Sequence, residues 1–147
     1  MVVEIASELR PEGSLQHRWQ ERLQDGGGLR LVAAGTPGSG KTSVLMHAVK
    51  DLIRAGHHPA LVKIDCMWTE DDARFKRLDV PVAVGLSRDM CPDHYAIYNF
   101  QEMMDWAAAQ QADILLNETA GLCLRCAPYP DKALAICVID VTTGPNS

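Results

Sequence analysis

One short stretch restricts the possible folds of this chain more than any other. Residues 35–42 read Gly-Thr-Pro-Gly-Ser-Gly-Lys-Thr and match G-x-x-x-x-G-K-[ST], the pattern of a phosphate-binding loop. An apolar run at residues 29–34 precedes the loop, and an amphipathic stretch at residues 41–55 follows it. Such a run is typical of a strand buried on both faces. The sequence therefore predicts a strand, a phosphate loop and a helix in succession.

Each residue type in the loop has a chemical task. Glycines allow backbone angles that point consecutive N–H groups at an anion, and the positive end of the following helix dipole adds to the attraction. Lys41 is expected to reach the β- and γ-phosphates of a nucleotide, and the Thr42 hydroxyl to bind Mg²⁺. The predicted nucleotide-binding residues are Gly35, Thr36, Pro37, Gly38, Ser39, Gly40, Lys41, Thr42 and Ser43.

Strand and helix patterns alternate along the rest of the chain. This alternation, with short connections, predicts an α/β fold of the P-loop NTPase type, with a mostly parallel sheet and helices on both faces. Further strands are expected at residues 60–66, 82–85, 114–117 and 135–141, and further helices at 70–78 and 95–111. The side chains expected to face the core from the first helix are Val44, Leu45, Ala48, Val49 and Leu52.

Residues 1–28 are predicted to form an appendage to the nucleotide-binding domain, which is assigned to residues 29–147. Leu15, Trp19 and Leu23 recur every four residues, which suits one face of a short helix. The Asp-Gly-Gly-Gly run that follows is expected to end the helix and act as a hinge. We expect the helix to pack on the main domain, and docking of a partner is the alternative.

The composition argues against several classes of protein. Apolar residues make up 47% of the chain, too many for a disordered protein, and no apolar run approaches the roughly 20 residues of a membrane-spanning helix. The N-terminus lacks the basic segment of a secretory signal. A net charge of −5 disfavours general binding to nucleic acid. The five cysteines are expected to be thiols or metal ligands in a reducing compartment, so we predict a cytoplasmic protein.

Beyond the loop, the order of motifs resembles one family, the nickel-insertion GTPases that serve the maturation of urease and hydrogenase. The resemblance runs from about residue 29 to residue 144. It implies that the chain binds GTP, or ATP, with Mg²⁺, hydrolyses it slowly, and delivers Ni²⁺ or Zn²⁺ to a metalloenzyme apoprotein or its accessory proteins. The matching stretches are 69–75 (Thr-Glu-Asp-Asp-Ala-Arg-Phe), 90–94 (Met-Cys-Pro-Asp-His), 118–121 (Glu-Thr-Ala-Gly) and 138–144 (Val-Ile-Asp-Val-Thr-Thr-Gly).

The resemblance also implies an acidic partner for Mg²⁺. Glu118 matches the acid that the family places near Mg²⁺ and water, which adds it to Lys41 and Thr42 as a catalytic candidate. It follows an apolar run, at the sheet edge where open α/β folds bind ligands; a solvated strand end is the alternative. Asp65 is a second metal-side candidate, but the family's aspartate stands where this chain has Cys66. A shift of one position is expected to turn Asp65 to the other side of the strand, unless the end of the strand is irregular.

Cys91 and His94 are the candidate ligands for the delivered metal. The family uses Cys-Pro-His or an adjacent Cys-His, and here one extra residue precedes the histidine. Thiolate and imidazole suit Zn²⁺ or Ni²⁺. Because two ligands do not close a site, we expect a homodimer that supplies four; a buried cysteine beside a helix-start histidine is the alternative. Cys123 and Cys126 are further candidate ligands, or else a structural or redox-sensitive pair.

The family pattern breaks off at the end of this chain. Relatives continue to an N-K-x-D motif that selects guanine, whereas this sequence stops at Ser147 without one. The domain is therefore expected to be truncated at its C-terminus, and the choice between GTP and ATP stays open. Two alternatives to a GTPase remain, a small-molecule or nucleotide kinase and a non-catalytic metal-binding module.

A fifth cysteine, Cys137, lies in an apolar strand and is expected to belong to the core.

Overall fold

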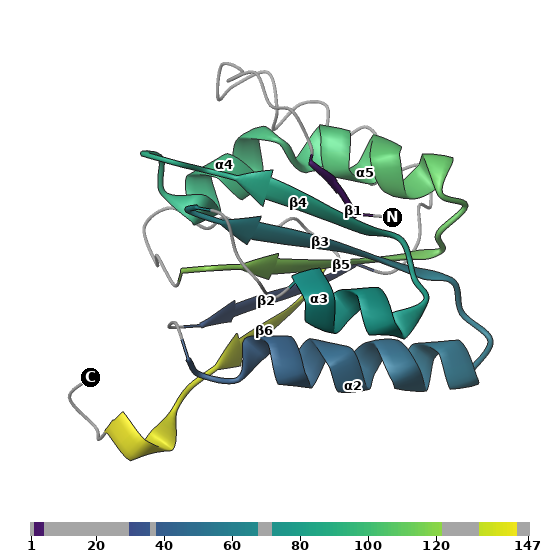
Figure 1. Ribbon diagram of the computed structural model, residues 1–147, viewed down its shortest axis with the longest axis horizontal. Helices are drawn as coiled ribbons and strands as arrows, with labels where there is room; N and C mark the ends of the chain where they lie inside the picture. Colours follow the sequence, from purple (N-terminus) through teal and green to yellow (C-terminus); the bar gives the residue numbers. More distant parts are fainter. Residues whose placement is uncertain (1, 5–29, 36–37, 68–71, 122–132, 144–147) are drawn as a thin grey trace.

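A single parallel sheet organises the chain in the computed structural model, which describes residues 2–4, 30–35, 38–67, 72–121 and 133–143. The sheet has six strands in the order β1-β4-β3-β5-β2-β6, and every neighbouring pair is parallel (Figure 1). The strands are β1 (Val2–Glu4), β2 (Arg30–Gly35), β3 (Pro59–Asp65), β4 (Val82–Leu86), β5 (Ile114–Thr119) and β6 (Ala133–Val138). The helices are α2 (Lys41–Arg54), α3 (Asp72–Phe75), α4 (Pro92–Tyr98) and α5 (Phe100–Ala109), with 3₁₀ turns at Lys76–Leu78 and Val141–Thr143.

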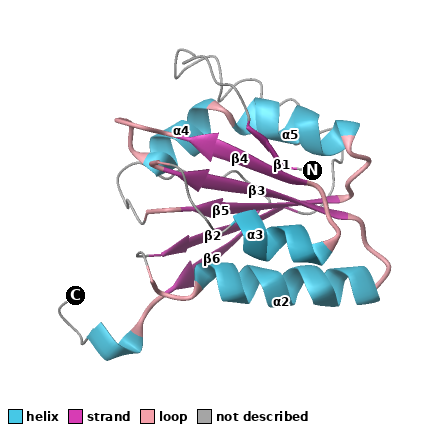
Figure 2. Ribbon diagram, in the orientation of Figure 1, coloured by secondary structure: helices cyan, strands magenta, loops and turns pink. Residues whose placement is uncertain are grey.

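Helices cover both faces of the sheet, as the sequence predicted (Figure 2). On one face, α2 and α3 contribute Leu45 and Phe75 to a buried apolar cluster. On the other face, α4 and α5 contribute Tyr95 and Met103 to a second cluster. The strands predicted before residue 120 are confirmed to within two residues at each end. Among the described residues, no helix is long and apolar enough to cross a membrane.

The inner face of α2 matches the prediction at four of its five positions. Leu45 and Val49 are fully buried, and Ala48 and Leu52 pack against the same cluster. The prediction for Val44 is wrong, because its side chain is 38% exposed. Consecutive residues lie about 100° apart around a helix, so Val44 lies at the margin of a face that is centred on Leu45 and Val49.

The helix predicted at residues 95–111 begins earlier and is interrupted. α4 starts at Pro92, since proline suits the first helical position. Asn99, with φ −108° and ψ 11°, separates α4 from α5. Its buried side-chain NH₂ donates to the Tyr95 carbonyl oxygen at 2.8 Å, a contact that competes with regular helix hydrogen bonding. Met103 in α5 is fully buried and fills the core.

The last described strand differs from the prediction. The sequence predicted a strand at residues 135–141, whereas β6 spans Ala133–Val138. The strand ends because Asp140 Oδ1 accepts hydrogen bonds from the Thr142 backbone N–H and hydroxyl, at 2.8 Å and 2.7 Å, which makes a local turn. Cys137 is exposed, so the expectation that it belongs to the core is wrong.

The N-terminal strand β1 was not expected from the sequence. It pairs with β4, with Val3 opposite Ala83, and so adds the first residues of the chain to one edge of the sheet. The predicted helix around Leu15, Trp19 and Leu23, and the glycine-rich hinge after it, lie outside the described residues. The division of the chain at residue 28 stays a prediction.

Candidate functional site

The phosphate loop lies at the carboxyl edge of the sheet, between β2 and the start of α2 (Figure 1). Gly38 and Gly40 have φ of +78° and +95°, in the region that favours glycine. A Cβ at either position would meet no atom within 4 Å, so the backbone conformation, not crowding, calls for glycine. Lys41 and Thr42 open α2 and are buried. This end of a helix carries backbone N–H groups without helical partners, which suits an anion. Gly35 ends β2, and Thr36 and Pro37 lie outside the described residues.

A cavity of about 450 Å³ opens beside the loop. Polar groups from the loop, α2, α3, β3 and β5 converge on it, an arrangement typical of a small-molecule site. Of the residues predicted from the sequence, it brings together Gly38, Gly40, Lys41, Thr42, Ser43, Asp65 and Glu118. The lining residues are Gly38, Gly40, Lys41, Thr42, Ser43, Lys63, Asp65, Arg74, Glu118 and Ala120.

Thr42 and Glu118 meet at the floor of this cavity. The Thr42 hydroxyl donates to Glu118 Oε1 at 2.9 Å, and both residues are less than 10% exposed. Strand β5 lies next to β2 in the sheet, so the Glu118 carboxylate lies beside the loop that follows β2. Glu118 is therefore not a solvated strand end. A hydroxyl beside a carboxylate is a donor set of the hard oxygens that Mg²⁺ prefers, so these residues fit that ion.

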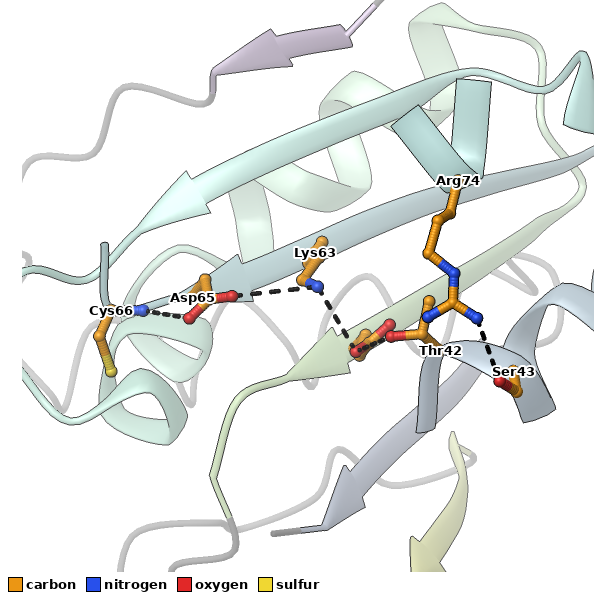
Figure 3. A network of polar contacts seen from close by, with 7 residues as sticks. Thr42, Ser43, Lys63, Asp65, Cys66 and Arg74 are labelled. Carbon is orange, nitrogen blue, oxygen red and sulfur yellow. Dashed lines mark hydrogen bonds and ion pairs between the residues drawn. The ribbon is translucent and has the colours of Figure 1, made fainter. Parts of the chain in front are cut away.

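Asp65, the last residue of β3, also faces the cavity. Its Oδ2 lies 3.9 Å from Lys63 Nζ, on the same face of the strand (Figure 3). Cys66 is exposed and donates its backbone N–H to Asp65 Oδ1 at 2.8 Å. The expectation that Asp65 turns to the other side of the strand is wrong, because residues 63 and 65 share one face.

Lys63 is a site residue that the sequence analysis missed. Its Nζ lies 3.8 Å from Glu118 Oε1, because Lys63 on β3 is the register partner of Glu118 on β5. The residue is 3% exposed, and its ammonium lies 5.9 Å from the centre of the Phe75 ring. A lysine within a run of buried apolar residues was the available signal, since a buried charge requires partners.

Arg74 on α3 borders the same cavity. Its Nη2 donates to the hydroxyl of Ser43 at 3.3 Å (Figure 3). The arginine is exposed, whereas Lys41 and Lys63 are buried. The cavity thus has two cations within it and a third at its mouth, which favours an anionic ligand.

The candidate metal ligands lie at the start of α4. Cys91 occupies the N-cap position without a side-chain capping hydrogen bond, and His94 lies in the first turn with its ring stacked on Tyr98, at a centroid separation of 6.2 Å. Both are half-buried. Within the part of the chain that the structure describes, no group of three or more His, Cys, Asp or Glu side chains could hold a metal ion. Cys123 and Cys126 lie outside that part.

The turn that carries Cys91 and His94 lies beside the end of β5. Asp93 is buried, and a Cβ added at Gly121 would come within 3.5 Å of its Oδ2. Gly121 directly follows Ala120, which lines the cavity. In the sequence, Cys123 comes two residues after Gly121. Residues 118–121 therefore run from the cavity to Asp93, which precedes His94 in the first turn of α4.

No family model matches the chain, but individual proteins do. It is 64% identical over 116 residues to an uncharacterized protein of Methanocaldococcus jannaschii, covering 79% of this chain and 49% of that protein. It is 32% identical over 129 residues to the urease accessory protein UreG of Edwardsiella ictaluri, covering 79% of this chain and 61% of UreG. The chain spans about half the length of the curated relatives it matches.

Solved structures show the same fold. HypB from Helicobacter pylori, in complex with nickel, matches with a TM-score of 0.67 and 22% identity over 90% of this chain and 62% of HypB. The hydrogenase maturation factor HypB from Archaeoglobus fulgidus matches with a TM-score of 0.65 and 20% identity, over 90% of this chain and 64% of that one. The P-loop NTPase fold is thereby confirmed. The sequence similarity to UreG supports assignment of this chain to the nickel-insertion GTPase family, and the HypB structures share its fold.

Proposed function

We propose that this chain binds a nucleoside triphosphate with Mg²⁺, hydrolyses it slowly, and uses the nucleotide to control delivery of a nickel-type metal ion for metalloenzyme maturation. The observation that carries the nucleotide part is the buried Thr42–Glu118 contact, 2.9 Å long, at the floor of a cavity that the phosphate loop lines. Family membership supports the metal-delivery part and favours GTP over ATP. It also supports a cytoplasmic protein with a metalloenzyme apoprotein or accessory proteins as partners.

In this proposal, the loop and the first turn of α2 hold the triphosphate. Backbone N–H groups of residues 38–42 and the Lys41 ammonium would bind the β- and γ-phosphates. Glu118 accepts a hydrogen bond from the Thr42 hydroxyl, which leaves the Thr42 oxygen lone pairs available to a cation. Thr42, Glu118 and Asp65 would together hold Mg²⁺, which when bound offsets the charge that develops on the phosphoryl oxygens.

Slow turnover follows from how this loop works. A phosphate loop positions the triphosphate but does little to activate the attacking water, so unassisted turnover is expected on the order of 10⁻⁴ to 10⁻³ s⁻¹. Glu118 is the proposed residue near that water. A rate this low suits a switch, since the bound nucleotide lasts long enough to define a state of the protein.

The metal part of the proposal rests on Cys91 and His94, with Cys123 and Cys126 as further ligands. A homodimer would bring the same ligands from each chain and complete a four-coordinate site. The connection through residues 118–121 supports coupling between the two sites. The Ala120 N–H donates to the Ile64 carbonyl oxygen of β3 at 3.0 Å, and the Ser87 N–H, in the turn before α4, donates to the Asp65 carbonyl oxygen of β3 at 2.8 Å. Movement of β5 around a bound triphosphate would be transmitted through β3 to that turn.

Equilibrium titration with fluorescent GTP and ATP tests the nucleotide part. With Mg²⁺ present, the chain is expected to bind one nucleotide, and Lys41→Ala to weaken binding by at least about tenfold, because the lysine contacts the phosphates. Lys50→Ala is the matched control, since Lys50 is an exposed lysine on the same helix. Binding that is absent, or that Lys41→Ala leaves unchanged, would contradict the proposal. Turnover only with an added acceptor would identify a kinase instead.

Metal stoichiometry tests the delivery part. The chain is expected to bind Ni²⁺ or Zn²⁺, and Cys91→Ala and His94→Ala to lower the bound metal per chain. Cys137→Ala is the control, because Cys137 is an exposed free cysteine on β6, outside the proposed ligand set. If Cys91→Ala binds as much metal as the unaltered chain, Cys91 is not a ligand and this part of the proposal is wrong.

A further inference from the structure

We propose that Lys63 is a built-in cation of the nucleotide site, which reduces the dependence of triphosphate binding on Mg²⁺. The inference rests on the proposed function, because it assumes that the cavity takes a nucleotide. It assigns a role in triphosphate binding to a residue that the phosphate-loop pattern does not include. The lysine would act on the charge of the site and not on the transferred phosphoryl group.

The position of Lys63 in the sheet supports this role. Register pairing between β3 and β5 sets Lys63 opposite Glu118, and the Lys63 ammonium lies 3.8 Å from Glu118 Oε1 and 3.9 Å from Asp65 Oδ2. The side chains of Lys63 and Glu118 are each 4% exposed. Their charges are therefore screened by solvent far less than those of a surface pair.

Lys63 and Thr42 meet at one oxygen. Glu118 Oε1 accepts the Thr42 hydroxyl at 2.9 Å and is also the nearer contact of the Lys63 ammonium. A divalent ion held by Thr42 and Glu118 would thus share its carboxylate with a positive charge that is already present. The attraction of Glu118 for Mg²⁺ is weakened by this neighbour.

The positive charge of Lys63 also favours binding of a triphosphate that carries no metal ion. The cavity lining carries three cationic side chains, Lys41, Lys63 and Arg74, and two acidic ones, Asp65 and Glu118. The formal balance is one positive charge with Lys63 and zero without it. Without Lys63, Lys41 and Arg74 would only balance the two carboxylates, and Mg²⁺ would have to supply the remaining attraction for a triphosphate. With Lys63, the protein supplies one net positive charge itself.

A purely structural role for Lys63 predicts a different result. A lysine that only neutralises the carboxylates of Glu118 and Asp65 would change the free energy of unfolding when replaced. It would not change the ratio between nucleotide affinity without Mg²⁺ and affinity with Mg²⁺. That ratio is therefore the measurement that separates the two roles.

The test measures the dissociation constant of fluorescent GTP in excess Mg²⁺ and in EDTA, for the unaltered chain and for Lys63→Met. Lys63→Met is expected to weaken binding in EDTA by at least about tenfold and to change binding in Mg²⁺ much less, because Mg²⁺ replaces the missing charge. Lys63→Arg is expected to keep the original ratio. Lys50→Met, which removes an exposed lysine from α2, is the control and should leave the ratio unchanged.

Circular dichroism establishes whether Lys63→Met is folded, and Lys63→Gln, a neutral polar replacement, is measured alongside it. A ratio that stays the same in both neutral variants would overturn the role of Lys63 while nucleotide binding stands. Absence of binding by the unaltered chain in Mg²⁺ would instead overturn the proposed function. A ratio that rises in a neutral variant and stays constant in Lys63→Arg and Lys50→Met supports the inference.

Discussion

Replacing both members of the Lys63–Glu118 pair, singly and together, tests whether these two buried charges interact. At 3.8 Å the Coulomb energy of two unit charges is about 4 kcal/mol for an effective dielectric constant of 20. The pair borders a cavity, and Lys63 also faces Asp65, so we expect a smaller coupling of about 1–3 kcal/mol. Glu118→Gln and Lys63→Met should each destabilise the fold by about 2–4 kcal/mol, because each leaves a buried charge with fewer partners.

Urea unfolding followed by circular dichroism gives the free energy of unfolding for the four proteins of this cycle. The double variant is expected to lose less stability than the sum of the two single losses. The exposed pair Arg54–Asp51, at 3.1 Å with side chains 77% and 73% exposed, is the control and should show coupling below about 0.5 kcal/mol. Single losses at the buried pair that add to within about 0.5 kcal/mol would refute the reasoning, since they would mean that the charges act independently.

Two further predictions concern the loop and the opposite edge of the sheet. Gly40→Ala should lower the free energy of unfolding by about 1–2 kcal/mol and weaken triphosphate binding, since φ at this position is +95°; unchanged urea unfolding would contradict this. A hydrogen bond from His57 lowers the pKa of the Asp113 carboxyl. The Asp113 carboxylate therefore stabilises the fold above its unfolded pKa of about 4, and this contribution is lost as the pH falls through the lower folded pKa. Asp113→Asn should therefore destabilise by less than about 1 kcal/mol at pH 7, with the difference closing as the pH falls through the lowered folded pKa; a difference that persists once the carboxyl is protonated would contradict it.

Local sequence patterns predicted the parts of the site that depend on local chemistry. The glycines and Lys41 of the loop form a pattern of adjacent residues, so a short stretch of sequence is sufficient to identify it. Glu118 ends a run of apolar residues in a strand, and this placed it at the carboxyl edge of the sheet before its hydrogen bond to Thr42 was known. The fold class followed from the alternation of strands and helices for the same reason.

The missed features depend on contacts between distant segments. Lys63 is a lone charge in an apolar strand, and only the register of β3 against β5 shows that it meets Glu118. Strand β1 has three residues, too few for any periodic pattern, and it exists through its pairing with β4. The interruption at Asn99 depends on a side chain that bonds to the backbone of its own helix, which hydrophobic periodicity does not report.

The central claim is that backbone amides of the phosphate loop bind a triphosphate. Two-dimensional NMR of the isotope-labelled chain, titrated with GTP and Mg²⁺, observes those amides directly. The largest shifts are expected for Gly38, Gly40, Lys41, Thr42 and Ser43, with saturation at one nucleotide per chain. Amide signals at these positions that stay unchanged while nucleotide is in excess would contradict the account.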